Sequence, residues 1–343
     1  MNPKVSVIVP NHNCESYVCR CIDSLLSQDF DNFEIIIVDD GSNDNSVLTI
    51  EEGYGLLCGQ TKIFHYEECT VKFTFVGYKE QRGVSVARNT GIELSTGDYL
   101  TFVDSDDFVD TDFLKLLYDK MSASDSDVVW CGFKNFNESR IKFEQPAVLQ
   151  SKVLSKQEYQ CMFYKYVDGL GSMCTKLYKA NIIRDHNIRL EEGRNKGEDW
   201  LFNLEYSRYI RNVSVISNVP YVYCRRIDSS TSKYNPDDIS KKLESLKVLI
   251  DFKEAEHLTI DEKMFEQKFA GEFSMCFMQL ILHEENAEDI IGSLFKNPLM
   301  KDALNWKTDS KLSIKYKLFW FLLRKGFVNQ AIYIVKKVYK LRN

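Results

Sequence analysis

The sequence lacks the long hydrophobic runs, repeats and targeting signals that mark several large protein classes. No stretch of about 18 apolar residues occurs, so we expect no membrane-spanning helix. No internal repeat or low-complexity segment is present, which argues against a repeat protein. Residues 1–4 lead directly into a strand-like run, so we expect no signal peptide.

Cysteine and histidine are present, but not in the spacings of disulfide frameworks or metal sites. The ten cysteines include no CxxC pair, and the five histidines are scattered without a ligand pair. We therefore expect reduced cysteines in a cytoplasmic protein. No Walker loop occurs either, which argues against a P-loop nucleotide site.

The bulk composition is that of an ordinary globular protein. The 343 residues are 44% hydrophobic and 27% charged, which suits one large domain or two ordinary ones. The net charge of −6 argues against nucleic acid as the main partner.

Strands and helices alternate over residues 1–130. Apolar and β-branched runs predict strands at 5–9, 34–38, 72–76, 99–103 and 127–133, and helices are predicted near 17–26, from 46, at 83–94 and after 110. Asn43 or Asp44 is the expected cap of the second helix, and 110–112 of the fourth. The alternation predicts an α/β fold with a doubly wound, mostly parallel sheet and helices on both faces.

The rest of the chain has a different pattern. Residues 51–70 have no clean period, and 134–235 predict short strands mixed with loops. Residues 236–343 contain no strand signal, and their apolar positions recur at helical intervals. A helical C-terminal extension is therefore expected.

Polar and mostly acidic residues follow three of the predicted strands. Asp104-Ser105-Asp106 follows one, Asp39-Asp40 follows another, and Pro10 to Asn13 follows the first. Open α/β sheets bind ligands beyond the carboxyl ends of their strands. We therefore expect these residues to face one crevice, where a phosphate compound is held through a metal.

The last residues, 311–343, are both basic and aromatic. They contain nine Lys and Arg residues and no acid, although the whole chain has a net charge of −6. Aromatic residues, including Phe319, Trp320 and Phe321, are interleaved with these charges. A helix on an anionic membrane surface has this composition. Alternatively, a helical pair packs its aromatic side chains on the α/β part of the chain and leaves its lysines in solvent.

The order of these motifs resembles that of the family 2 inverting glycosyltransferases, which have a GT-A fold. The matching segments are Val5–Pro10, Asn13, Ser24–Gln28, Ile37–Ser42, Ala87–Gly91, Gly97–Tyr99, Asp104–Asp107, Lys176–Tyr178, Gly197–Trp200 and Tyr223–Ser230. Each match alone is weak, but their common order over residues 3–235 is specific. The resemblance implies a catalytic domain at 1–235, with a nucleotide-sugar half at 1–110 and an acceptor half at 111–235, followed by the helical extension at 236–343.

The resemblance implies that Asp106, with Asp104, binds a divalent metal, Mn²⁺ or Mg²⁺. Hard cations prefer carboxylate and phosphate oxygens. A metal here would bridge the diphosphate of a nucleotide sugar and stabilise the charge on the leaving group. Asp104 and Ser105 would also contact the donor. Alternatively, these acids form a capping cluster for the helix after Asp110.

Recognition of the base of a UDP-sugar is assigned by the resemblance to Asp40, with Asp39 beside it. An Asx turn is the structural alternative, because Asp-Gly-Ser is a common turn sequence. Pro10 and Asn13 would shape the wall under the nucleotide. His12 either stacks on the base or lies in the loop without contacting it.

Gly83 and Arg88 belong to a predicted helix that begins close to the crevice. A helix N-terminus favours anions, and arginine is suited to phosphate. Arg88 therefore contacts the diphosphate or, as we favour, pairs with Asp39 or Asp104 and positions it.

A lid is a further expectation. Arg225 or Arg226, with Ser230 and Thr231, would close on the diphosphate. Surface loop residues in solvent are the alternative.

Glu198-Asp199 is the expected second chemical centre. An inverting transfer needs a base on the acceptor side, and a carboxylate within hydrogen-bond reach can take the hydroxyl proton. The base of the resembling family is the aspartate of such a pair, which implies Asp199 and makes Glu198 the less favoured choice. Trp200 would stack on the acceptor sugar. Alternatively, the two acids stabilise a helix N-terminus.

These features predict an inverting, metal-dependent glycosyltransferase. It would move a sugar from a nucleotide donor, a UDP-sugar, to a hydroxyl of a glycan or of a lipid-linked oligosaccharide in bacterial polysaccharide assembly. A sugar-phosphate nucleotidyltransferase is one alternative, but its usual Gly-rich basic loop is missing from Pro10–Cys14. A non-catalytic glycan-binding protein is the other, although the acids at 104, 106 and 199 are all present.

Overall fold

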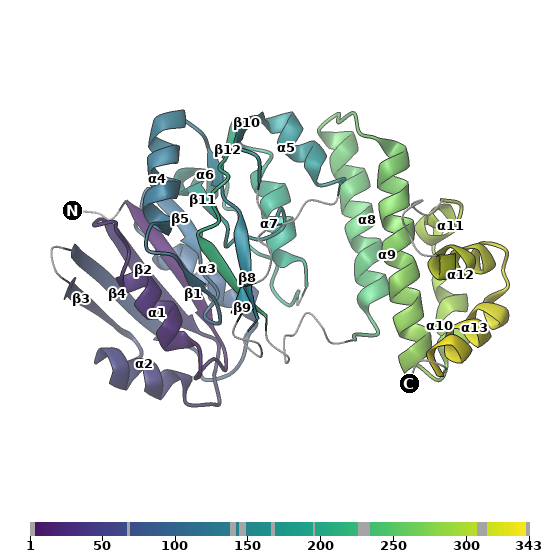
Figure 1. Cartoon of the computed structure of the whole chain (residues 1–343), viewed down its shortest axis with the longest axis horizontal. Coiled ribbons are helices and arrows are strands. Elements are labelled where there is room, and N and C mark those ends of the chain that lie inside the picture. Colours follow the sequence, from purple (N-terminus) through teal and green to yellow (C-terminus); the bar gives the residue numbers. More distant parts are fainter. Residues whose placement is uncertain are drawn as a thin grey trace. The chain divides into compact units, whose positions relative to one another are not determined.

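The computed structural model describes residues 4–66, 69–137, 142–143, 149–165, 169–194, 196–225, 234–306 and 314–340. The chain separates into two units (Figure 1). Unit 1 comprises residues 1–159 and 168–229, and unit 2 comprises 160–167 and 230–343.

Unit 1 alternates strands and helices over its first half, as the sequence predicts. Its first elements are β1 (Val5–Asn11), α1 (Val18–Leu26), β2 (Phe33–Asp39), α2 (Ser46–Tyr54), β3 (Gln60–Tyr66), β4 (Cys69–Gly77), α3 (Val84–Leu94), β5 (Tyr99–Phe102), β6 (Phe108–Val109) and α4 (Phe113–Ser124). They are followed by β7 (Val128–Trp130), β8 (Phe133–Asn137), β9 (Lys142–Phe143), β10 (Lys152–Ser155), α5 (Lys156–Met162, whose last three residues belong to unit 2), β11 (Lys176–Lys179), α6 (Ala180–Asp185), α7 (Glu198–Tyr206), β12 (Asn212–Val215) and β13 (Tyr221–Arg225).

The large sheet of unit 1 has the strand order β10-β12-β7-β11-β5-β1-β2-β4-β3. The strands β5, β1, β2 and β4 at its centre are parallel, as expected. In contrast, β3, β10 and β11 run antiparallel to their neighbours. The reason for β3 is its short connection to β4, since parallel strands need a crossover of a dozen or more residues. Figure 1 shows α1 in front of the central strands, and α3 packs on their other face.

The central strands are buried on both faces. Every residue of β1 and of β2 is buried, so their sequences are nearly continuous apolar runs rather than alternating ones. Close packing of α3 on β1 depends on Gly91, where a Cβ atom would lie 2.3 Å from a side-chain carbon of Ile8. This glycine lets the helix approach the strand more closely than any side chain would allow.

A second sheet, with the order β6-β13-β8-β9, lies beside the acidic segment that follows β5. Its strand β13 pairs with the short β6, which begins immediately after residue 107. The segment 103–107 is therefore held between the large sheet and this smaller one.

Some local expectations need correction. The predicted cap at 110–112 is wrong: Asp112 precedes α4 without a side-chain capping bond, and the Asp110 carboxylate pairs instead with Lys134 at 2.6 Å. The cap of α2 was expected at Asn43 or Asp44, but the N-cap residue is Asn45, which makes no side-chain capping bond; Asp44, one residue earlier, accepts a hydrogen bond from the N–H of Ser46 at 2.9 Å. Residues 134–235 were expected to be short strands and loops, but they also form α5, α6 and α7.

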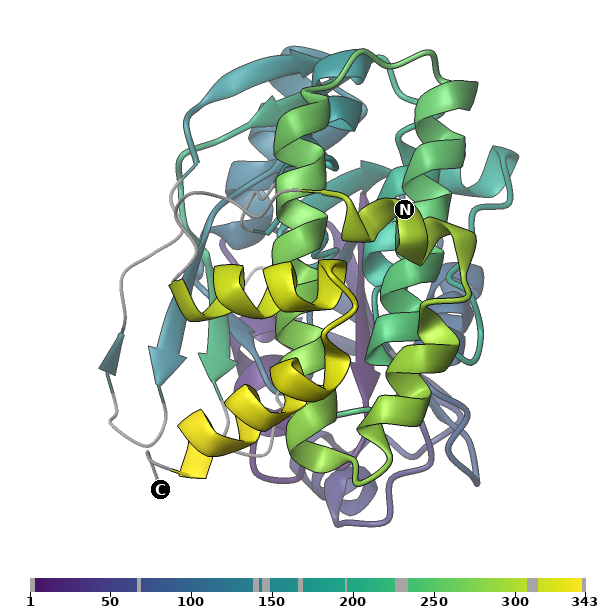
Figure 2. The ribbon, with the colours of Figure 1, turned by 90° about the vertical axis from the view of Figure 1, so that its right-hand side faces the viewer.

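Unit 2 is helical over its described residues 234–306 and 314–340. Its helices are α8 (Asp238–Ala255), α9 (Glu262–His283), α10 (Ala287–Leu294), α11 (Pro298–Leu304), α12 (Ile314–Arg324) and α13 (Val328–Lys340). On α9, buried phenylalanines recur every fourth residue, at 265, 269, 273 and 277, and form one face of the core. Both α12 and α13, the yellow helices of Figure 2, lie against α9. Within the described ranges, every helix is too short or too polar to cross a lipid bilayer.

Candidate active site

Three polar strand ends meet at one edge of the large sheet, as the sequence predicts. Since β5, β1 and β2 are adjacent and parallel, their carboxyl ends lie side by side. In this register Asn11 is opposite Asp39, and Phe102, two residues before Asp104, is opposite Ile8. The acidic residues after these strands therefore share one site.

Asp39 forms the turn at the end of β2. Its carboxylate accepts hydrogen bonds from the N–H of Ser42 at 2.9 Å, from the Ser42 hydroxyl at 2.6 Å and from the amide of Asn11 at 2.7 Å. The Asx turn that the sequence allowed at Asp40 is therefore made by Asp39.

The end of β1 is tied to the same turn. Pro10 is buried within the strand. The side-chain oxygen of Asn13 accepts a hydrogen bond from the N–H of Asn43 at 2.9 Å, and Nδ1 of His12 lies 2.9 Å from the carbonyl oxygen of Asp40. These contacts give His12 and Asn13 a structural role in joining the two strand ends.

The Asp40 carboxylate is buried and faces the start of α3. It accepts hydrogen bonds from the N–H of Arg82 at 2.7 Å and from the N–H of Gly83 at 2.8 Å. Gly83 has a φ of 101°, in the left-handed region that favours glycine. Asp40 therefore positions the first turn of α3, and its contact with a nucleotide base stays a prediction.

Arg88 joins the donor and acceptor sides of the predicted site. Its guanidinium donates to the Asp104 carboxylate at 2.9 Å and to the Glu198 carboxylate at 2.9 Å. The Arg88 side chain is buried, whereas one third of the Asp104 side chain is exposed. The expected pairing with Asp104 is confirmed, and the pairing with Glu198 is additional. Arg88 therefore positions two carboxylates at once.

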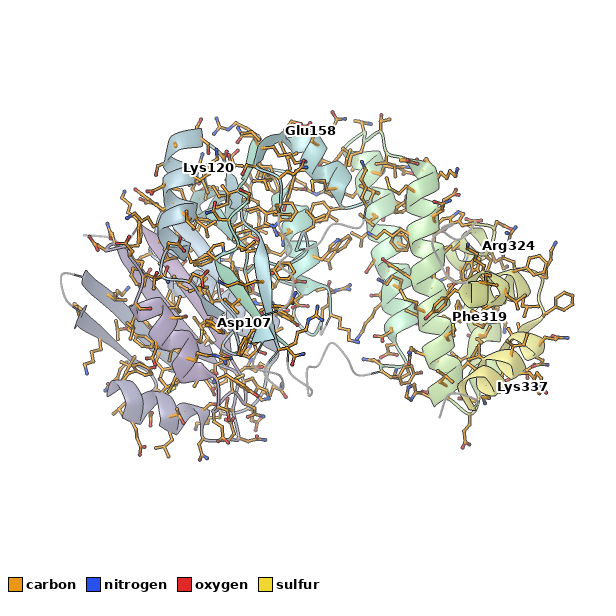
Figure 3. All side chains as sticks on the ribbon, in the orientation of Figure 1. Asp107, Lys120, Glu158, Phe319, Arg324 and Lys337 are labelled. Atoms are coloured by element: carbon orange, nitrogen blue, oxygen red, sulfur yellow. The ribbon has the colours of Figure 1, made fainter. Side chains whose placement is uncertain are left out.

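The acidic segment after β5 is anchored by Asp107, which is labelled in Figure 3. The Asp107 carboxylate accepts hydrogen bonds from the hydroxyl of Tyr221 at 2.5 Å and from the N–H of Cys224 at 2.8 Å, both in β13. From α1, the guanidinium of Arg20 donates to the carbonyl oxygen of Asp106 at 3.1 Å. Both anchors fix the backbone that carries the expected metal ligands.

Negative charge is concentrated in this segment. Burial raises the pKa of Asp107 well above its usual value, and the nearby Asp106 and Asp104 carboxylates add to the effect. Burial also raises the pKa of the Cys21 thiol, and the same three carboxylates add to that increase. Carboxylate oxygens are the ligands that hard divalent cations prefer, so Asp104 and Asp106 are the residues here that could hold one.

The second centre is the first turn of α7. Glu198 is buried, and Asp199 is partly buried and accepts a hydrogen bond from the N–H of Trp200 at 2.7 Å. Burial raises the pKa of Asp199 to about 6, and the Glu198 carboxylate adds to this shift, whereas Arg88 opposes it. A carboxylate with this pKa is charged at neutral pH and can still accept a proton efficiently.

A buried lysine beside this turn was not assigned a role from the sequence, although it belongs to a matching segment. Lys176 donates to the carbonyl oxygens of Gly169 at 3.0 Å and of Leu170 at 2.9 Å, and also to that of Ser172. Burial lowers the pKa of Lys176 to about 7. The ammonium group therefore organises the loop 169–172.

Asn203 connects that loop to the acceptor side. Its amide donates to the carbonyl oxygen of Gly171 at 2.8 Å and to that of Asp199 at 2.9 Å. A Cβ atom at Gly171 would lie 3.5 Å from Trp200. The loop 169–172 and the expected acceptor residue Trp200 are thus neighbours.

The remaining predicted residues are less informative. Ser105 is buried between Asp104 and Asp106. Arg225 ends β13 and donates to Asn135 at 3.2 Å, while the other expected lid residues, 226, 230 and 231, lie outside the described residues. Within the described ranges, no group of three or more His, Cys, Asp or Glu side chains forms a ready-made metal site. Magnesium sites often consist of one or two carboxylates completed by substrate phosphates, which is the arrangement expected here.

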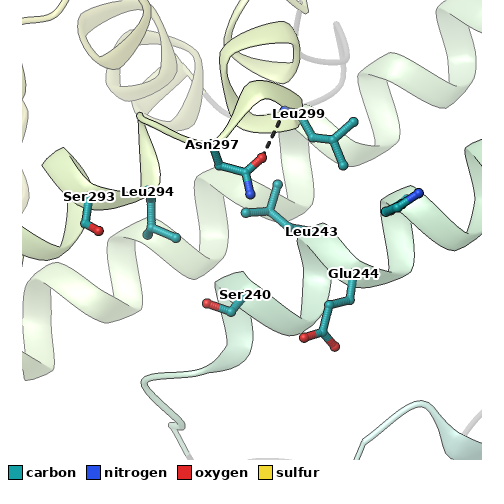
Figure 4. A pocket seen from close by; sticks show the side chains of 8 residues that line it. Ser240, Leu243, Glu244, Ser293, Leu294, Asn297 and Leu299 are labelled. Atoms are coloured by element: carbon teal, nitrogen blue, oxygen red, sulfur yellow. Dashed lines mark hydrogen bonds between the residues drawn. The ribbon is translucent and has the colours of Figure 1, made fainter.

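A groove of about 380 Å³ lies in unit 2, between α8 and the α10–α11 turn (Figure 4). It is lined by Leu243 and Glu244 on one side and by Leu294, Asn297 and Leu299 on the other. None of the site residues described above lines it, so it is not part of the candidate active site.

Similarity to known proteins agrees with this geometry. The model of glycosyl transferase family 2 matches residues 6–185, which is more than half of the chain. The uncharacterized glycosyltransferase EpsJ of Bacillus subtilis is 31% identical over 245 residues, 69% of this chain and 65% of that protein. Glycosyltransferase GlyA of Streptococcus pneumoniae is 30% identical over 65% of this chain and 31% of that protein. The chain thus spans less than two-thirds of the length of these relatives.

Solved structures agree on the fold. The crystal structure of Staphylococcus aureus TarS residues 1–349 in complex with UDP-GlcNAc aligns with 99% of this chain and 92% of that one, with a TM-score of 0.66 and 21% identity. This likeness concerns the fold and confirms the predicted GT-A architecture with a helical C-terminal region. Because the family model matches more than half of the chain, the chain belongs to glycosyl transferase family 2.

Proposed function

We propose that this protein transfers a sugar from a UDP-sugar to a hydroxyl group of a glycan or a lipid-linked oligosaccharide, with inversion at the anomeric carbon. The observation that carries the proposal is the bridge made by Arg88, which places the acidic strand end at Asp104 beside the Glu198-Asp199 turn. A donor centre and a base therefore adjoin each other. The binding of UDP-GlcNAc by TarS, a protein of the same fold, supports the choice of a UDP-sugar.

In this proposal, residues 1–235 form the catalytic domain, with a donor half at 1–110 and an acceptor half at 111–235. Residues 236–343 form the helical extension. The reaction takes place in the cytoplasm. No disulfide joins the nine cysteines whose side chains the structure describes, which is consistent with a reducing compartment.

Asp106 and Asp104 would hold the metal, Mn²⁺ or Mg²⁺. Their carboxylate oxygens are the ligands that such cations prefer, and a cation would relieve the repulsion between neighbouring acids that, after burial, raises the pKa of Asp107. When bound, the metal supplies positive charge to the diphosphate of the donor. The other donor contacts come from Pro10, Asn13, Asp39, Asp40, Gly83, Arg88, Ser105 and Arg225.

Asp199 is the general base. Its pKa of about 6 leaves it charged at neutral pH, and it takes the proton of the acceptor hydroxyl as the oxygen attacks the anomeric carbon. Glu198 is held by Arg88 at 2.9 Å, which makes it a positioning residue rather than the base. The attack occurs opposite the departing nucleotide, in a single displacement that inverts the anomeric carbon. Trp200, beside the loop 169–172, provides the surface for the acceptor sugar.

Calorimetric titration with UDP, with and without Mn²⁺, tests the donor site. Wild type should bind UDP in a metal-dependent manner, and Asp106→Ala should weaken that binding by about 100-fold or more, since it removes a direct ligand. Asp112→Ala, which removes an exposed aspartate from the same stretch of chain, is the matched control and should bind as wild type.

Two outcomes would contradict the proposal. Absence of UDP binding under both conditions would overturn the UDP assignment. Equal binding with and without Mn²⁺ would overturn the metal assignment and leave the sugar-transfer proposal to be tested with a panel of UDP-sugars.

A further inference from the structure

The helices α12 and α13 each have one buried face. On α12, Phe319, Trp320 and Leu323 are buried, and the indole N–H of Trp320 donates to the carbonyl oxygen of Trp306 at 2.9 Å. On α13, Ala331 and Val335 are buried. Since both helices lie against α9, these residues form part of the core of unit 2.

Large apolar side chains also lie on the opposite faces of these helices. On α12, Ile314 is 81% exposed, Leu318 46% and Phe321 49%. Their spacing of four and three residues places all three on one side of the helix. Phe327, in the turn between the helices, is 48% exposed, and Tyr333 on α13 is 64% exposed. Isolated exposed hydrophobic residues are common, but a cluster on one helical pair marks an interaction surface.

Basic side chains surround these exposed residues. Arg324, Lys325, Lys336 and Lys337 are all exposed, and the Lys337 ammonium lies 5.7 Å from the ring centroid of Tyr333. No acidic residue occurs between 314 and 340. In Figure 3, Phe319 points toward α9, whereas Arg324 and Lys337 project away from it. The exposed side of the pair is therefore apolar, aromatic and positively charged at once.

We propose that this exposed face of α12 and α13, termed the basic aromatic face and comprising Ile314, Leu318, Phe321, Arg324, Lys325, Phe327, Tyr333, Lys336 and Lys337, binds the surface of an anionic lipid membrane. Charge complementarity favours this partner, because every charged residue on the face is basic. The aromatic and aliphatic side chains between the charges fit the boundary between headgroups and acyl chains, where amphipathic helices bind.

This inference separates the two interpretations of the C-terminal sequence. Phe319 and Trp320 pack inside unit 2 and are not available to a membrane, whereas Phe321, Phe327 and Tyr333 are. The membrane contact goes beyond the proposed transfer reaction. Membrane binding is measured without any nucleotide sugar. The membrane proposal can therefore fail while the sugar-transfer proposal holds, and the reverse.

Co-sedimentation of the full chain with lipid vesicles tests the proposal. We expect binding to phosphatidylcholine vesicles that contain phosphatidylglycerol, and little binding to phosphatidylcholine alone. Binding should weaken strongly when the salt concentration rises from about 0.1 M to about 1 M, because the screening length falls from about 10 Å to about 3 Å.

Two groups of variants separate charge from insertion. The double variant Lys336→Ser and Lys337→Ser should weaken binding about 30-fold, since each basic residue near an anionic surface contributes about fivefold. Phe321→Ser should weaken it about fivefold, because only half of that ring is free to enter the lipid. The matched controls are Lys301→Ser on α11 and Met275→Ser on α9, both exposed and outside the face, which should bind as wild type.

Three outcomes would overturn the proposal. One is an absence of binding to either vesicle type. Another is equal loss of binding in the control variants. The third is a concentration-dependent dimer, in vesicle-free solution, that Phe321→Ser disrupts, because the face would then bind a second copy of the chain. Circular dichroism and thermal unfolding of each variant show whether unit 2 is intact, and Phe319 and Trp320 are left unchanged for that reason.

Discussion

Buried acids at the two ends of the large sheet are in opposite electrostatic situations. At the amino end of β2, Glu34 accepts hydrogen bonds from the Ser6 hydroxyl at 2.7 Å, from Lys72 at 2.8 Å and from the N–H of Thr96 at 2.6 Å. Burial alone would raise the pKa of Glu34, but these bonds outweigh it and the pKa lies below its usual value. Its hydrogen bonds and the ion pair with Lys72 therefore offset the cost of burying the Glu34 charge.

Asp127, which precedes β7 at the same end of the sheet, is similar. Burial opposes its charge, yet hydrogen bonds from Arg211 and Lys179 lower its pKa. At the carboxyl end, Asp107 and Asp199 have raised pKa values, because burial and neighbouring carboxylates outweigh their hydrogen bonds. The comparison shows that hydrogen bonds and basic partners offset the buried charge of the structural acids Glu34 and Asp127, whereas Asp107 and Asp199 stay next to other carboxylates. A site that binds a cation and contains a general base requires such uncompensated acids.

Replacement of Asp199 should have the largest effect. Asp199→Asn keeps the shape but removes the base, so the rate of sugar transfer should fall about a thousandfold while UDP binding is unchanged. Glu288→Gln, an exposed acid in the first turn of α10, is the control. A rate within tenfold of wild type would mean that another group is the base.

The pH dependence of folding stability in Asp199→Asn tests whether the charge of Asp199 is disfavoured in the folded protein. Since the folded-state pKa of Asp199 is raised from 3.8 to about 6, wild type loses stability as the pH rises between these two values, and the loss is complete above about 6. Asp199→Asn should therefore be more stable than wild type by about 3 kcal/mol near pH 8, and no more stable near pH 4. Thermal unfolding at the two pH values measures this.

Exchange of a compensated acid and a crowded acid should have opposite effects on folding. Glu34→Gln loses the charged hydrogen bonds and should lower the free energy of unfolding by about 2 kcal/mol at pH 7. Asp107→Asn keeps an oxygen for the N–H of Cys224 and removes a disfavoured charge, so it should not be destabilising. Urea unfolding distinguishes the two. Equal destabilisation would mean that the crowding at residue 107 has no energetic consequence.

The pH dependence of catalysis should show the smallest change. In wild type, kcat/KM should rise with pH and level off above about 6, as Asp199 loses its proton. Glu198→Gln removes a neighbouring negative charge, so this transition should move to lower pH. A transition that stays in place would show that Glu198 does not influence the base.

The strand ends of the site were predictable because their signal is local. The runs at 5–9 and 35–38 are apolar and β-branched, and the acids follow them directly. An Asx turn was considered only as the alternative at Asp40, and it is Asp39 that makes it, since two adjacent aspartates have the same sequence signal. Residues 60–66 show no strand pattern in the sequence because β3 is an edge strand, in which polar and apolar residues are mixed. Even Ile63 in this strand is 58% exposed.

Contacts between distant segments were not predictable from a single sequence. Arg88 and Glu198 are 110 residues apart, and Asp110 and Lys134 are 24 apart. Because the Asp110 carboxylate pairs with Lys134, it does not cap α4, although the local sequence pattern favoured that cap. For the C-terminal helices, the sequence showed basic and aromatic residues together, but only the packing on α9 determines which aromatics are buried.

One consequence concerns a position that has no side chain. Gly91 lies three residues after Arg88 on α3, and the helix touches β1 there so closely that even a methyl group would meet Ile8. Substitution by alanine would push the helix outward and carry the guanidinium away from its two carboxylates. A substitution that leaves every proposed catalytic residue in place would in this way abolish sugar transfer. Screens for loss of function should therefore include the packing glycines as well as the acids.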